Sequence, residues 1–201
     1  MQENLVHFGP SAFAPVALGF FGLGTGYFVW GGQALFRFPE VETPEVSRSM
    51  GLWAFWMPGF MQFVTGIILF AGLTVFQGVF TGDPLLYMAA LAFTAYGIHW
   101  FSMAHRRYVG ASAVPDAWMA CAFAIISVLG AVVFALGNVW MVAGVFIGLS
   151  LIYLTEIPFR FGKLPLGGRL VGFWQFGTGL YLMYLTWAVT LDLALGWQLP
   201  S

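Results

Sequence analysis

Long apolar stretches without charged side chains follow one another along most of the chain. They cover residues 4–36, 49–82, 84–105, 117–155 and 170–191, and each exceeds the roughly 20 residues that a helix needs to cross the hydrocarbon core of a bilayer. The apolar positions do not alternate with polar ones, so no strand pattern competes with a helix. The pattern therefore predicts membrane-spanning helices.

The stretch 117–155 is too long for a single crossing. Its 39 residues correspond to about 58 Å of helix at about 1.5 Å per residue, nearly twice the hydrocarbon thickness. Gly137-Asn138 is the natural turn, because both residues tolerate the left-handed conformation that ends helices. We therefore predict an all-α integral membrane protein, a six-transmembrane-helix bundle with a single membrane domain over residues 1–201. The spans are placed near 12–36, 50–76, 84–105, 115–136, 139–157 and 169–193.

Composition supports this assignment and excludes some functions. The chain is 60% hydrophobic and only 7% charged, whereas a water-soluble domain carries roughly a quarter charged residues. The formal net charge is −1 and there is no basic run, so no nucleic-acid partner is expected. The lipid bilayer is the partner that the composition predicts.

All basic side chains fall in alternate connections between the predicted spans. The connections that hold them follow the first, third and fifth spans, and the residues are Arg37, Arg48, Arg106, Arg107, Arg160, Lys163 and Arg169. Because Lys and Arg stay on the cytoplasmic side, we expect both termini outside. An odd number of spans would scatter these charges over both faces, so the asymmetry also supports six.

A short motif recurs three times in the predicted spans. Gly-Phe, four residues and then Thr-Gly appear at 19–26, 59–66 and 172–179, and the last two copies are identical at six of eight positions. On a helix, each of those two copies places a glutamine, Gln62 or Gln175, between two glycines on one face. The motif has two interpretations: close helix packing with interhelical hydrogen bonds, or a lining of amides along the path of a small polar solute.

Titratable side chains near the membrane are few, and they predict no enzyme. His99 lies about one and a half turns inside the cytoplasmic end of its span, so it is either a pH-sensitive group or an interfacial histidine bonded to a neighbouring helix. His99 and His105 are offset by roughly 240° on one helix, so no metal or haem site is expected. With Cys121 as the single cysteine, and no nucleophile elbow, phosphate loop or carboxylate pair, we expect no cofactor and no catalytic residue.

Tyr96 lies in the middle of a span, where a phenol needs a polar partner or a wet cavity. Its surroundings, Ala92-Phe93-Thr94-Ala95-Tyr96-Gly97, resemble a motif of the acetate uptake transporter family, which includes the bacterial succinate-acetate permease. Segments 56–66 and 18–24 are similar to further motifs of that family in the same order. The resemblance implies a bacterial cytoplasmic membrane protein, hexamers of six-helix subunits, and a narrow pore for acetate or another small monocarboxylate.

On that resemblance, the hydrophobic constriction of the family falls on Leu23, Tyr96 and Leu149. Hydrogen-bonding side chains that would then follow the solute path are Gln62, Thr94, Tyr96 and Gln175. The sequence also departs from the family: its signature is reduced to Ala14-Pro15-Val16-Ala17, and the basic residues predict external termini where the family has cytoplasmic ones. The alternative function is a noncatalytic accessory subunit of a larger membrane complex, in which aromatic side chains fill the interior.

Overall fold

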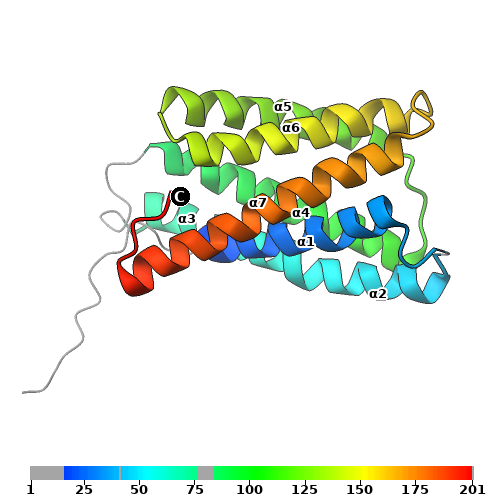
Figure 1. Ribbon diagram of the computed structural model, residues 1–201, viewed down its shortest axis with the longest axis horizontal. Helices are drawn as coiled ribbons and strands as arrows, with labels where there is room; N and C mark the ends of the chain where they lie inside the picture. Colours follow the sequence, from blue (N-terminus) through cyan, green and yellow to red (C-terminus); the bar gives the residue numbers. More distant parts are fainter. Residues whose placement is uncertain (1–15, 41, 77–83, 201) are drawn as a thin grey trace, which may run out of the picture.

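The computed structural model describes residues 16–40, 42–76 and 84–200, and the regular secondary structure of these residues is entirely helical (Figure 1). The helices form six rods along one common direction, with the second rod built from three consecutive segments. In chain order they are α1 (Val16–Phe36), α2 (Pro44–Ala54), η1 (Phe55–Phe60), α3 (Met61–Thr74), α4 (Leu85–Val109), α5 (Asp116–Leu136), α6 (Trp140–Arg160) and α7 (Gly167–Leu195). The predicted all-α fold is confirmed.

Five of the six rods are long and apolar enough to cross a membrane: Pro44–Thr74, Leu85–Val109, Asp116–Leu136, Trp140–Arg160 and Gly167–Leu195. The chain is therefore a multi-span membrane protein. The remaining helix, α1, has 21 residues, but six of these are glycine, at positions 19, 22, 24, 26, 31 and 32, which lowers its hydropathy. Its role as a sixth span stays a prediction, and residues 12–15 of the span proposed at 12–36 lie outside the described residues.

The second rod begins at Pro44, six residues before the predicted start, and this corrects the placement of Arg48 in a connection. Thr43 caps the helix: its hydroxyl accepts a hydrogen bond from the Val46 N–H at 3.4 Å. Proline suits the first helical position, where the missing N–H costs no hydrogen bond. These local signals start the helix within the polar segment, before the apolar stretch on which the predicted span was based.

Pro58 interrupts this rod and produces the π-helical segment η1. Proline has no N–H to donate and clashes with the preceding turn, so a regular α-helix does not continue through it. The side chain of Gln62, one turn further on, donates from Nε2 to the Pro58 carbonyl at 2.9 Å. A rod that the sequence predicts as regular therefore contains a local widening at its middle.

The turn between α5 and α6 is confirmed at Gly137-Asn138. α5 ends at Leu136, Asn138 has φ 60°, and α6 begins at Trp140. Asparagine is among the few residues other than glycine that enter this conformation readily. The two helices form an antiparallel hairpin, which is the uppermost pair in Figure 1.

Glycines of the recurring motif lie where neighbouring helices approach most closely. A methyl group added at Gly66 would stand 2.6 Å from the Thr94 backbone nitrogen on α4, and one at Gly179 would stand 2.8 Å from the Phe28 nitrogen on α1. Small residues allow this approach of backbones in membrane helices. The motif thus joins α3 to α4 and α7 to α1.

All seven basic residues lie at one end of the bundle, the right-hand end in Figure 1. The ends of α1, α4 and α6 and the starts of α2, α5 and α7 meet there. At the opposite end, Asp192 is the sole ionisable acidic or basic side chain among residues 84–200. This asymmetry supports the predicted orientation, which itself remains a prediction.

Candidate functional site

An apolar cavity of about 210 Å³ lies between α1, α4, α5, α6 and α7, toward the end of the bundle that carries the C-terminus. Leu23, Tyr96 and Leu149, which come from three different helices, all line it. These are the three residues that the family resemblance assigns to a constriction. The structure brings them together, and among the described lining residues Tyr96 is the one with a polar side chain.

Tyr96 is buried, and its hydroxyl has a partner on another helix. The distance from Tyr96 Oη to Ser127 Oγ on α5 is 2.7 Å, and Ser127 Oγ in turn donates to the Phe123 carbonyl at 2.6 Å. Because the serine proton is used toward Phe123, Tyr96 is the donor to Ser127. The need for a polar partner at this mid-span phenol is therefore met by a side chain that the sequence did not single out.

A second, polar cavity of about 800 Å³ opens at the charged end. Its lining includes Gln175 together with Arg106, Arg107, Arg160 and Glu156. The predicted path residue Gln175 therefore faces a wet, charged space.

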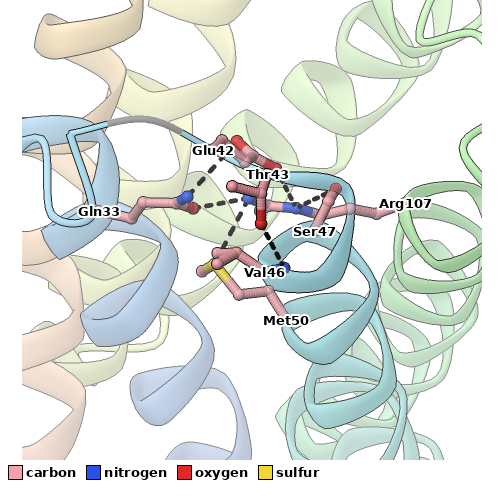
Figure 2. A network of polar contacts seen from close by, with 7 residues as sticks. All are labelled: Gln33, Glu42, Thr43, Val46, Ser47, Met50 and Arg107. Atoms are coloured by element: carbon pink, nitrogen blue, oxygen red, sulfur yellow. Dashed lines mark hydrogen bonds and ion pairs between the residues drawn. The ribbon is translucent and has the colours of Figure 1, made fainter.

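Arg107 links the residues on one side of the polar cavity through hydrogen bonds (Figure 2). Its guanidinium donates to Glu42 Oε1 and to Gln33 Oε1, each at 2.7 Å from Nη2, and lies over the Trp30 ring at 4.7 Å. Figure 2 shows the side chain reaching from α4 across to α1, with Ser47 of α2 beside it. One arginine thus ties three helical segments and the connection between α1 and α2 together.

Four charged residues form a second cluster beside this cavity, which we call the ion-pair cluster: Arg106, Asp116, Glu156 and Arg160. Asp116 Oδ2 lies 2.7 Å from Arg106 Nη2 and 3.9 Å from Arg160 Nη2, and Arg160 also pairs with Glu156 at 2.7 Å. The cluster joins the ends of α4, α5 and α6. Glu156 and Arg160 lie four residues apart on α6, so this pair lies within one helix.

An aromatic layer includes Tyr96 of the apolar cavity and Trp30 of the polar cavity. Tyr96 stacks on Tyr153 with ring centroids 6.1 Å apart, and Trp100 packs against Trp30, a lining residue of the polar cavity, at 4.8 Å. His99 lies in the same layer, 4% exposed and 4.2 Å from the Phe123 ring. Within the described part of the chain, neither ring nitrogen of His99 has a hydrogen-bond partner, so the predicted bond to a neighbouring helix is not found there.

Two predicted path residues lie elsewhere. Gln62 is fully buried and occupied with the Pro58 carbonyl, and Thr94 donates to the Ala90 carbonyl at 2.8 Å in the contact between α3 and α4. Neither lines the two cavities. Sequence reasoning missed Ser127 and Tyr153; their polar groups in mid-span were the available signal, the same one that identified Tyr96.

The described residues contain no group of three or more His, Cys, Asp or Glu side chains able to hold a metal ion. No protein-family model, curated protein or solved structure matches the chain. Fold and composition together define the class as a multi-span membrane protein, and the two cavities with their aromatic layer are its candidate functional site.

Proposed function

We propose that the protein is a channel or transporter that carries a small solute, a monocarboxylate such as acetate, across a bacterial cytoplasmic membrane. The observation that supports this most is the meeting of Leu23, Tyr96 and Leu149 at one cavity. Residues 73 and 53 positions apart in the sequence converge there, and they are the three that the family resemblance associates with a constriction. Assembly into homo-oligomers, hexamers if the resemblance extends that far, belongs to the same proposal.

The chemistry of the two cavities suits this function. The polar cavity presents Gln175 and Arg37 to a carboxylate arriving from the charged end, while Arg106, Arg107 and Arg160 are paired with acidic side chains. The apolar cavity accommodates the aliphatic part, and the aromatic layer between them is a closed barrier that must open for passage. Hydrophobic constrictions gate pores in this way by excluding water.

Uptake into proteoliposomes tests the proposal. Radiolabelled acetate is supplied to vesicles that contain the unmodified protein, Tyr96→Ala or Tyr87→Ala, and to empty vesicles. Tyr87 lies on the same helix but is 47% exposed and lines neither cavity, so it is the matched control. We expect protein-dependent uptake that rises for Tyr96→Ala, because the constriction widens, and is unchanged for Tyr87→Ala. Uptake equal to that of empty vesicles would reject acetate as the solute.

The second candidate function is a noncatalytic accessory subunit of a larger membrane complex. The bond between Tyr96 and Ser127 favours it, because a hydroxyl held by a neighbouring helix in a packed layer is what a purely structural tyrosine shows. Under this function, Tyr96→Ala lowers stability without any change in flux. Affinity purification from native membranes would then recover the protein in a stoichiometric complex with other chains.

A further inference from the structure

The apolar cavity is larger than acetate requires. A cavity of about 150 Å³ lined by aliphatic and aromatic side chains stays dry and holds benzene, with six carbon atoms. The cavity here has about 210 Å³ and is lined by aliphatic and aromatic residues from five helices. A two-carbon solute would leave most of this apolar surface without contacts, so the shape favours a ligand with a longer aliphatic chain.

The one polar side chain among the described lining residues indicates what head group fits. Tyr96 donates its proton to Ser127, and Ser127 donates to the Phe123 carbonyl, so the Tyr96 oxygen is left only as an acceptor. An undissociated carboxyl group carries an O–H that can be donated to it. A carboxylate only accepts hydrogen bonds and would meet no donor side chain among the described lining residues, which is strongly unfavourable.

We propose that the apolar cavity is a binding site for straight-chain monocarboxylic acids of about four to six carbons in their undissociated form. The chain packs among Leu23, Phe93 and Leu149, and the carboxyl O–H is donated to Tyr96. The ligand class rests on the proposed function, but the binding itself requires no transport.

The titratable groups around Tyr96 are uncharged phenols and an imidazole. Tyr27 of α1 and Tyr153 of α6 face it, and His99 lies one turn along α4. Charged groups face His99 from α4 and α6, namely Arg106 and Arg160 of the ion-pair cluster. The pH dependence expected below therefore arises in the ligand carboxyl group, and a ligand that does not titrate serves as the control.

Equilibrium binding to the full chain in lipid nanodiscs tests the site. Radiolabelled hexanoic acid is measured at pH 5, empty nanodiscs are subtracted to remove partitioning into lipid, and unlabelled acids of two, four, six and eight carbons compete. We expect saturable binding whose affinity rises about fourfold for each added methylene up to six carbons, with no further gain at eight. Affinity independent of chain length would overturn the proposal, as would an absence of saturable binding.

Two variants that fill the cavity, Ala89→Phe and Val142→Phe, are compared with Leu91→Phe, an exposed position on α4. We expect at least a tenfold loss of hexanoic acid affinity in the first two and none in the third. Circular dichroism and size-exclusion chromatography establish that each variant is folded. Unchanged binding in a folded cavity-filling variant would overturn the proposal without reference to the chain-length series.

Raising the pH to 8 tests the protonation state. The undissociated fraction of a carboxylic acid with a pKa of about 4–5 falls roughly several hundredfold between pH 5 and pH 8, so apparent affinity for hexanoic acid should fall equally, while hexan-1-ol binding stays constant. Equal hexanoate binding at both pH values would contradict the undissociated form. Binding as expected without acetate uptake would reject the proposed transport function and support this binding site. Acetate uptake with a binding affinity that does not depend on chain length would support transport and reject the binding site.

Discussion

Replacing Asp116 by asparagine should destabilise the protein far more than breaking an ion pair of equal length at the surface. Asp116 is 4% exposed and lies 2.7 Å from Arg106, with Arg160 at 3.9 Å. The change keeps the shape of the side chain and removes its charge, so two guanidinium groups lose their common counter-charge. The ion pairs that connect α4, α5 and α6 at this end of the bundle depend on that negative charge.

The magnitude follows from burial. Removing one partner of a buried ion pair costs about 3–5 kcal/mol, because the other charge remains desolvated. The arginines here keep 21% and 27% exposure, which lets water compensate in part and places the cost near the lower end, at about 3 kcal/mol. Asp116 also occupies the first turn of α5, where a negative charge adds about 0.3–1 kcal/mol through the helix dipole.

Glu42→Gln is the matched control. Glu42 also lies 2.7 Å from an arginine, Arg107, but its side chain is 44% exposed, so the expected cost is about 0–1 kcal/mol. The free energy of unfolding is measured in mixed dodecylmaltoside and dodecyl sulfate micelles by tryptophan fluorescence. Equal losses for the two variants, or a loss below about 1 kcal/mol for Asp116→Asn, would refute the argument that burial decides the contribution of these pairs.

Two further predictions concern packing and orientation. Gly97→Ala should lower the free energy of unfolding by about 1–3 kcal/mol, because the added methyl group would lie 2.6 Å from the Phe63 backbone nitrogen. Gly177→Ala, with open space at that position, should raise it by about 0.5–1 kcal/mol. The same unfolding assay checks both variants, and a change of the same sign in the two would contradict this prediction. In a Cys121→Ser background, a cysteine at Gln198 should react with an impermeant maleimide added outside cells and one at Ser112 should not, since the basic end is expected in the cytoplasm. Labelling of Ser112→Cys alone would invert the orientation.

The sequence was sufficient for the helices because their signals are local. Length and apolarity identified the rods, and the prediction of a Gly137-Asn138 turn needed only the tolerance of asparagine for a positive φ. Ends were less certain where capping competes with hydropathy. Thr43 and Pro44 start a helix in a polar segment, so a rule based on apolar runs alone placed that start too late.

The site was less predictable, because it depends on distances between helices. The amino-acid sequence alone does not show how the helices pack. It therefore does not show that Ser127 lies opposite Tyr96, or that the ring of Tyr153 stacks on Tyr96. Nor does it show that Leu23 and Leu149 line the same cavity. Those facts depend on how α4 packs against α5 and α6, which composition does not quantify.

The two glutamines of the repeated motif show how nearly identical local sequences acquire different roles. Four residues before Gln62 stands Pro58, whose helix turn is widened, and the amide of Gln62 is bound to that proline carbonyl inside the bundle. Four residues before Gln175 stands Val171, within the regular helix α7, and the Gln175 side chain lines the polar cavity. One amide is therefore bound within its own helix, and the other lines the polar cavity. A solute path through this protein would pass Gln175 and Tyr96 but not Gln62, so the symmetry of the motif does not extend to the site.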